Sequence, residues 1–469
     1  MTIIYDIDRG RLNECRLDGK PEFHLRDTAH LIIYPISKDY FCVTNSLLNK
    51  SFLIAKDSWK GAGKYPAEFA GFVGYPSEPL RETELPENCL ELSQDDITFV
   101  IAMSYKCNLH CKYCYQQCDT KLNRDKISVE NLNEIFSVIS LYHERHPEKY
   151  ISIELFGGEP LLTENYDEII RIFDFCVDHK FPVAITTNGV NLPYYLKDLI
   201  IYSGLQIAVN TTIDSISDNE KTRFSSSGKE DSSGSSLLNS IYTLINNDVF
   251  VSVEANIDQH NIGSLRGMIG FYEENGFLDN PNFNFSIGRV DDRRFETGYD
   301  KMVTDSELLV ELSKIERIPP QVSYAFVKSS LFLCHKLDPM FRQMEMRYVS
   351  NYCWASSPIQ QVFYIDAQLD VFRCTYTVGR KQYSLFKFTL EALEAFRPHN
   401  RTYMDYPRCR KCDIAGYCSG GCALSADVNF DRMCLDEKTD FDSFMNSLFY
   451  PRVKIMMENQ SILQAAREE

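Results

Sequence analysis

Short apolar stretches alternate with amphipathic stretches through the middle of the chain. Six runs of strand length are dominated by apolar and β-branched residues, at 97–103, 150–157, 181–188, 205–213, 250–257 and 283–288. Between the first three runs, residues 131–146 and 165–179 repeat apolar residues at the spacing of a one-faced helix. Six such units predict an α/β fold with a parallel sheet curled into a partial (β/α)6 barrel, similar to a TIM barrel. In such barrels the loops at the carboxyl ends of the strands carry the functional groups.

The sequence on either side of this core has a different pattern. Residues 1–95 hold several short apolar runs separated by polar turns, which predicts a small β-rich N-terminal domain. We expect the barrel domain at 96–300 and a helical bridge at 301–350. Residues 351–440 are rich in cysteine with little regular periodicity, and residues 441–469 predict a closing C-terminal helix.

Composition and charge narrow the classes of partner. The 469 residues are 44% apolar and 25% charged, and the net charge of −17 disfavours binding to nucleic acid or to an anionic membrane. The sequence shows no apolar run of about 20 residues and no secretory signal pattern. Its sixteen cysteines are clustered in a large chain, which favours metal ligation in a reducing compartment over a disulfide framework. We therefore expect a cytoplasmic protein that does not span a membrane.

Three cysteines follow the first predicted strand, in the run CNLHCKYCY with the spacing Cys107-x3-Cys111-x2-Cys114. Three thiolates from one short loop cannot complete a four-coordinate structural zinc site, but they can hold three irons of a [4Fe–4S] cluster. The fourth iron then remains open to a reactive ligand. The alternative is that the three cysteines are buried or incidental.

This spacing resembles the signature of radical SAM enzymes. In that family the open iron binds the amino and carboxylate groups of S-adenosylmethionine. An electron from the reduced cluster then cleaves the cofactor, and the 5′-deoxyadenosyl radical abstracts hydrogen from the substrate. The resemblance also implies an electron donor of the flavodoxin or ferredoxin type. Since the cofactor carries the organic chemistry, the protein would supply orientation and exclusion of water.

Two further features near this loop match the family. The run Gly157-Gly158-Glu159-Pro160 follows the second predicted strand and resembles the segment that meets the methionyl amine of the cofactor. Glycines at such a position let the backbone approach a ligand closely. The resemblance also places Tyr113 against the adenine, with ordinary core packing as the alternative.

The resemblance assigns more distant residues to the same cofactor. Thr187 and Asn188 fall where the family has ribose or sulfonium contacts. Thr212 and Arg223 lie in a segment similar to that of the family's fourth strand, and Arg223 could pair with the cofactor carboxylate. The alternative for Arg223 is a surface position. Ser215 stands where the family usually has glycine.

A second group of seven cysteines lies in the C-terminal third, comprising Cys353, Cys374, Cys409, Cys412, Cys418, Cys422 and Cys434. Seven thiols exceed one tetrahedral site, although structural zinc remains an alternative. The array resembles the SPASM extension of radical SAM proteins and implies two auxiliary [4Fe–4S] clusters. One complete set would be Cys409, Cys412, Cys418 and Cys434, and the other would be Cys353, Cys374 and Cys422.

The second of these sets has three thiols and no evident fourth ligand. The stretch WASSPIQQ after Cys353 contains no cysteine where relatives with a closed site have one, so an iron stays open unless Cys334 or another group fills it. An open iron could ligate a substrate, accept an electron or hold water.

SPASM enzymes mostly modify ribosomally made peptides or proteins, so the resemblance implies a precursor peptide as the substrate and a thioether, carbon–carbon or ether cross-link as the product. Sulfatase-maturing members have an aspartate after the cysteine equivalent to Cys374, where this chain has Thr375. Sulfatase-type oxidation of a protein, radical modification of a small molecule, and a non-catalytic zinc-binding scaffold are the alternatives. The N-terminal domain is a candidate for docking a leader peptide as an added strand, with plain packing against the barrel as the alternative. No residue can be named as the catalytic base.

Overall fold

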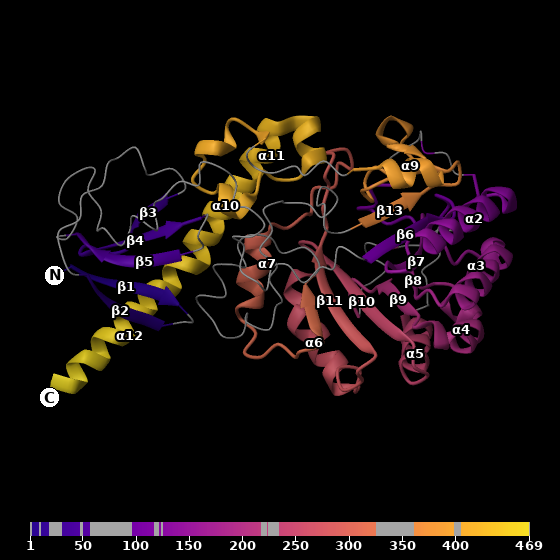
Figure 1. Ribbon diagram of the computed structural model, residues 1–469. Helices are drawn as coiled ribbons and strands as arrows, with labels where there is room; N and C mark the ends of the chain where they lie inside the picture. The colour runs from indigo at the N-terminus through magenta and orange to yellow at the C-terminus, as the bar shows by residue number, and fades with distance from the viewer. Residues whose placement is uncertain are drawn as a thin grey trace.

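A ten-stranded sheet forms the centre of the chain in this computed structural model (Figure 1). The structure describes residues 2–8, 11–17, 31–46, 50–56, 96–116, 122, 125–216, 223, 234–324, 361–397 and 405–468. The strands lie in the order β12-β11-β10-β9-β8-β7-β6-β13-β14-β15.

The six strands predicted from the sequence are neighbours in this sheet. They are β6 (Asp96–Ala102), β7 (Tyr150–Phe156), β8 (Val183–Thr187), β9 (Ala208–Thr212), β10 (Phe250–Ile257) and β11 (Phe283–Arg289). Each pairs in parallel with the next. The predicted α/β fold with a partial barrel and a β-rich N-terminal region is confirmed.

Helices cover the outer face of the six parallel strands (Figure 1). They are α2 (Val129–Arg145), α3 (Tyr166–His179), α4 (Leu192–Ile201), α5 (Gly234–Ile245) and α6 (Leu265–Glu274). Ser128 caps α2, since its side chain accepts a hydrogen bond from the Asn131 amide at 3.1 Å. The apolar faces of these helices bury alternate residues of each strand and leave the other strand positions to face the barrel interior.

The inside of the barrel is polar and partly open. On β10, Val251, Val253 and Ala255 are fully buried on the helix side, whereas Glu254 and Asn256 face inward and are only partly buried. In a closed (β/α)8 barrel, branched apolar side chains fill this space. Here the polar, partly accessible lining provides an internal site.

The sheet continues beyond the six parallel strands on both sides. β12 (Val322–Tyr324) pairs with β11, and β13 (Gln361–Ile365) pairs in parallel with β6. β14 (Asp370–Phe372) and β15 (Phe386–Lys387) follow as antiparallel strands. The region in which the sequence shows little periodicity therefore contains strands, which are too short to give a repeating pattern.

The remaining helices lie on the C-terminal side. They are α7 (Asp305–Leu312), α9 (Leu390–Ala395), α10 (Ala415–Cys418), α11 (Ala423–Phe444) and α12 (Tyr450–Glu468), with a π-helical segment at Met445–Phe449 between the last two. Of the expected helical bridge, residues 301–324 contain α7 and β12, and residues 325–350 lie outside the described residues. None of the helices in the described ranges combines the length and the apolar character needed to cross a membrane.

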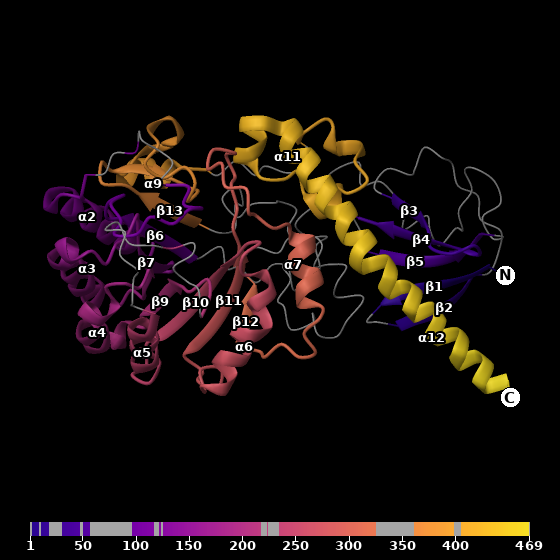
Figure 2. The same ribbon diagram turned by 180° about the vertical axis from the view of Figure 1, so that it is seen from behind.

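A separate five-stranded antiparallel sheet lies at the N-terminus. Its strands are β1 (Thr2–Asp8), β2 (Arg11–Leu17), β3 (Leu31–Pro35), β4 (Tyr40–Asn45) and β5 (Lys50–Ala55), in the order β2-β1-β5-β4-β3. The long helix α12 runs across this sheet (Figure 2). The rings of Tyr34 and Tyr450 stack with centroids 3.7 Å apart, so the two ends of the chain pack together.

Candidate functional site

The loop that leaves β6 carries Cys107, Cys111 and Cys114, and it is held against the glycine pair that follows β7. The Gly158 amide donates to the Ser104 carbonyl at 2.8 Å, and the Glu159 amide donates to the Lys106 carbonyl at 2.8 Å. A Cβ on Gly158 would lie 2.3 Å from the Lys106 carbonyl oxygen. Only glycine therefore allows this close approach of two backbones.

The three thiols of this loop are half-buried and lie within one another's electrostatic influence. Burial raises the pKa of Cys107 to about 11 and that of Cys111 to about 12, and charge on the neighbouring thiols adds to both shifts. Donors nevertheless surround the sulfur of Cys107, which accepts from the Leu109 amide at 3.4 Å and from Asn188 Nδ2 at 3.5 Å. A thiolate bound to a positively charged group would benefit from these donors, because they favour its deprotonated form.

Glu159 connects the second and third loops. Its carboxylate is fully buried and accepts from Thr187 Oγ1 at 2.6 Å, from the Asn188 amide at 2.6 Å and from the Leu161 amide at 2.8 Å. These three donors occupy the carboxylate, so Glu159 fixes the relative position of the loops around Cys107. Thr187 is likewise buried and donates to Glu159, while Asn188 extends to Cys107.

Tyr113 reaches across the mouth of the barrel to the segment after β9 and to the end of β10. Its hydroxyl donates to Asp214 Oδ2 at 2.6 Å and accepts from Arg223 at 3.3 Å and from Asn256 Nδ2 at 3.5 Å. Arg223 is only 7% exposed and also donates to the Asn188 carbonyl at 3.4 Å. Arg223 therefore stands at the site with Tyr113, and the alternative of a surface position for Arg223 is excluded.

Two acidic residues inside the barrel were not predicted from the sequence. Glu254 on β10 pairs in register with Thr212 on β9, the remaining predicted cofactor contact. Burial and then the nearby Asp214 raise the pKa of Glu254 to about 7. Burial also raises the pKa of Glu154 on β7, which accepts from Thr186 Oγ1 at 2.8 Å. The sequence signal that could have revealed both residues is a polar side chain at an inward-facing position of a strand that is otherwise largely apolar.

Part of the second cysteine group lies directly beside the first. Tyr115 follows Cys114, and its ring packs on that of Tyr376 with centroids 4.3 Å apart. Burial raises the pKa of Tyr115. Charge on Cys114 adds to this shift, and charge on Cys374 is the third cause. Cys374 therefore lies close to the three-cysteine loop.

Cys422 occupies the position before α11, near the same contact. Burial lowers the pKa of Arg293. The nearby Asp291, and after it the Cys422 thiol, act in the opposite direction and raise that pKa. Burial and Asp291 raise the pKa of Tyr376, and Arg293 opposes this shift. Arg293 and Tyr376 thus link the surroundings of Cys422 with those of Cys374. Cys353, the third predicted member of this set, lies outside the described residues, as does Cys334.

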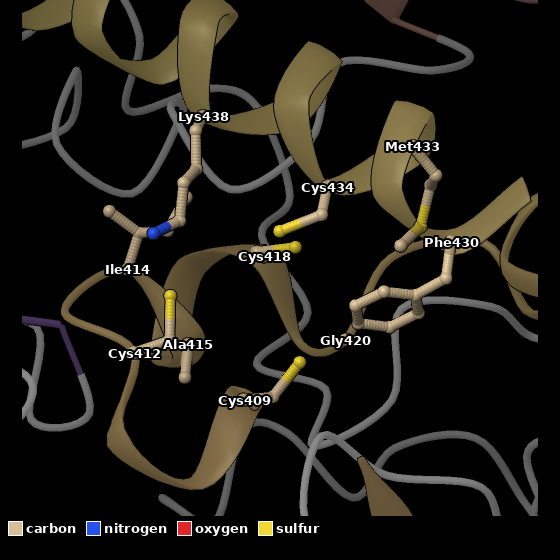
Figure 3. Close-up of a pocket in the computed structure, with 10 residues that line it drawn as sticks. All are labelled: Cys409, Cys412, Ile414, Ala415, Cys418, Gly420, Phe430, Met433, Cys434 and Lys438. Carbon is tan, nitrogen blue, oxygen red and sulfur yellow. The ribbon is translucent and has the colours of Figure 1, made fainter. Parts of the chain in front are cut away.

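The other four cysteines line one pocket between α10 and α11 (Figure 3). Their sulfurs point into a common space (Figure 3), and the pocket is lined by Cys409, Cys412, Ile414, Ala415, Cys418, Gly420, Phe430, Met433, Cys434 and Lys438. The short helical turn Cys409–Lys411 presents the first two thiols, α10 ends at the third, and α11 presents the fourth.

The donors at both sites are thiols. Within the described residues, the loop after β6 supplies three of them, and the pocket between α10 and α11 supplies four. Thiolates are the ligands that hold iron–sulfur clusters, so both donor sets fit such a group, and four thiolates can also bind zinc.

Comparison with known proteins identifies the barrel. Residues 101–233 match the family model described as the Radical SAM superfamily. A probable GTP 3′,8-cyclase of Methanocella arvoryzae is 33% identical over 116 residues, which is 25% of this chain and 34% of that protein. A putative glycyl-radical enzyme activating enzyme of Methanocaldococcus jannaschii is 33% identical over 102 residues, 22% of this chain and 34% of that protein. The chain thus spans about a third of the length of these curated relatives.

Solved structures share the fold over a larger part of the chain. The structure of anSMEcpe with bound AdoMet has a TM-score of 0.56 at 15% identity, covering 77% of this chain and 96% of that one. The structure of Streptococcus suis SuiB bound to S-adenosylmethionine has a TM-score of 0.51 at 15% identity, covering 85% of this chain and 95% of that one. Residues 101–233 thus match a radical SAM domain, which includes the three-cysteine loop and the strands β7, β8 and β9 of the partial barrel.

Proposed function

We propose that the chain is a radical SAM peptide maturase with a SPASM-type extension, which forms a thioether, carbon–carbon or ether cross-link in a ribosomally made peptide. The proposal rests chiefly on the presence of two separate thiol sites in one molecule. Three cysteines follow β6 at the mouth of the barrel, and four others line the pocket between α10 and α11.

At the first site, Cys107, Cys111 and Cys114 would hold the [4Fe–4S] cluster that binds S-adenosylmethionine. When bound, this pair supplies the reductive cleavage and the radical that takes hydrogen from the substrate. The chain's own residues position the cofactor. Gly157 and Gly158 bring a backbone edge to the loop, while Arg223 offers a fixed guanidinium to a carboxylate.

Tyr113, Thr187, Asn188 and Thr212 complete the proposed cofactor site from four different loops or strands. The buried carboxylate of Glu159 holds two of these residues in place through charge-assisted hydrogen bonds. Such cross-links between loops keep the site rigid, so that the radical forms at a defined distance from the substrate.

At the second site, Cys409, Cys412, Cys418 and Cys434 would hold a complete auxiliary cluster. Cys353, Cys374 and Cys422 would hold another with an open iron. The packing of Tyr115 on Tyr376 supports this arrangement, because it places Cys374 next to the loop of the first cluster. An electron donor of the flavodoxin or ferredoxin type would supply the reducing equivalents.

A peptide substrate is supported by the shared fold of anSMEcpe, whose structure with AdoMet and the Cp18Cys peptide has a TM-score of 0.54 at 16% identity. The N-terminal sheet offers a place to dock the leader segment. β3 lies at an edge of the five described strands, and an extended peptide can add to such an edge by main-chain hydrogen bonds.

Radical modification of a small molecule is the second candidate, and the relatives favour it. The matched region of about a quarter of the chain is shared with GTP 3′,8-cyclases. Stimulation of S-adenosylmethionine cleavage separates the two candidates. A precursor peptide encoded beside this protein should accelerate cleavage if the chain is a maturase, whereas GTP should accelerate it if the chain is a cyclase.

Anaerobic purification followed by iron and sulfide analysis tests the cluster assignment. We expect a brown protein with about 12 irons, as three [4Fe–4S] clusters require. Replacing Cys107, Cys111 and Cys114 by alanine should abolish cofactor cleavage and leave about two thirds of the iron. A colourless, zinc-loaded protein would contradict the proposal. Mass spectrometry of the co-expressed peptide then identifies the bond that is formed.

A further inference from the structure

The four-cysteine pocket contains a cation that the cluster assignment does not use. Lys438 is the one basic residue among the described residues that line this pocket. The other lining residues besides the cysteines include Ile414, Phe430 and Met433. Lys438 follows Cys434 by four residues on α11, so both side chains project from the same face of the helix. The amine of Lys438 extends toward Cys412 across the pocket (Figure 3).

The contact between Lys438 and Cys412 is electrostatically significant for both groups. The Cys412 thiol is the first cause that raises the pKa of Lys438, by its charge and also by a side-chain hydrogen bond. Lys438 and the four cysteines line the same pocket, so the positive charge of the lysine lies beside the thiols that the cluster assignment uses.

Lys438 forms a weak ion pair with Asp413. Asp413 Oδ1 lies 3.9 Å from Lys438 Nζ, and the two side chains are 55% and 46% exposed. Ion pairs with this exposure contribute little, so the pair does not neutralise the lysine. Asp413 Oδ1 also lies 3.6 Å from the sulfur of Cys412 and accepts from the Ile414 amide at 3.1 Å. A cation and an anion therefore flank the same thiol.

We propose that Lys438 is a positioning residue that sets the reduction potential of the cluster bound by Cys409, Cys412, Cys418 and Cys434. This inference rests on the auxiliary cluster of the proposed function. A cluster with four thiolates carries net negative charge, and reduction adds one more. A nearby cation stabilises the reduced form more than the oxidised form, and hydrogen bonds to the sulfurs act in the same direction.

The test is a redox titration followed by electron paramagnetic resonance, made on the full chain with Cys107, Cys111 and Cys114 replaced by alanine. In this background the remaining signals come from the auxiliary clusters. Lys438→Met keeps the length of the side chain and removes its charge, so one cluster signal should move to lower potential. Lys438→Arg keeps the charge and should leave that signal close to its original potential. Asp413→Asn removes the opposing charge and should raise the potential of the same signal.

Unchanged potentials in Lys438→Met, with iron content equal to that of the background, would overturn the role of Lys438 while leaving the auxiliary clusters intact. A shift of equal size in Lys438→Met and Lys438→Arg would overturn it as well, because packing rather than charge would then be the cause. Loss of all iron from the triple-alanine background would instead refute the auxiliary clusters themselves, and this inference with them.

Discussion

Replacing Gly158 by alanine should disrupt the contact between the three-cysteine loop and the strand beside it. The new Cβ would lie 2.3 Å from the Lys106 carbonyl oxygen and 2.7 Å from the Tyr105 carbonyl group. These neighbours are backbone atoms, so no side chain can turn away to make room. The loops must separate by about 1 Å, which strains the chain and lengthens the hydrogen bonds from the Gly158 and Glu159 amides.

The size of the effect follows from these two contributions. Overpacking costs about 1–3 kcal/mol, and each lost hydrogen bond costs about 0.5–1.5 kcal/mol. The free energy of local opening should therefore fall by at least about 2 kcal/mol. Since 1.36 kcal/mol corresponds to a factor of ten, exchange of protected amides should accelerate by about 30-fold or more.

Hydrogen–deuterium exchange measured by mass spectrometry checks this prediction. The reporter is the Asn188 amide, which donates to Glu159 Oε2 at 2.6 Å and lies in a peptide that the mutation leaves unchanged. Gly267→Ala is the matched control, because its Cβ meets nothing within 4 Å and it lies inside α6. That substitution should be neutral or stabilising. Equal exchange at Asn188 in wild type and Gly158→Ala would refute the reasoning.

Three further predictions concern other parts of the molecule. Arg223→Gln should raise the Kd for S-adenosylmethionine, measured by calorimetry, by about 10- to 100-fold, because a charge-assisted pair is lost. The control Arg266→Gln changes an exposed arginine and should leave the Kd unchanged. Because the folded-state pKa of Glu254 is raised to about 7 from 4.5, wild type should lose up to about 3 kcal/mol of stability as the pH rises from 5 to 8. In urea unfolding Glu254→Gln should gain stability relative to wild type over that range, and a difference that does not vary with pH would contradict the assignment. Thr304→Ala removes the capping box of α7 and should lower the local stability of this helix by about 0.5–2 kcal/mol, which faster amide exchange in α7 would show. The control Thr243→Ala lies in the middle of α5 and should cause no such loss.

Features with a local signal could be predicted from the sequence. The strands β6 to β11 are apolar runs of regular spacing, and the helices between them have one apolar face, so the partial barrel followed from periodicity alone. The loop with Cys107, Cys111 and Cys114 and the glycine pair at Gly157 and Gly158 have fixed spacing within a few residues, and the structure places them together.

Features that depend on long-range packing could not be predicted in this way. The hydrogen bond between Tyr113 and Asp214 joins residues 101 positions apart, and no local pattern encodes it. The pKa shift of Glu254 depends in part on Asp214, which lies beyond the end of the neighbouring strand β9, and no local pattern in β10 encodes that neighbour. Lys438 was within reach of prediction, because it stands four residues after Cys434, but only if the helix α11 had first been recognised in a segment with weak periodicity.

The addition of β13 to β6 explains how one sheet can organise both cysteine groups. β13 pairs in parallel with the strand that precedes the three-cysteine loop, and β14 follows it and leads directly to Cys374. The carboxyl ends of β6 and β13 therefore lie at the same edge of the sheet, and the loops that leave β6 and β14 meet through Tyr115 and Tyr376. A displacement of β13 would alter the surroundings of both groups at once. The part of the second cysteine group around Cys374 is thus joined to the barrel sheet, whereas Cys409, Cys412, Cys418 and Cys434 lie in a pocket between helices.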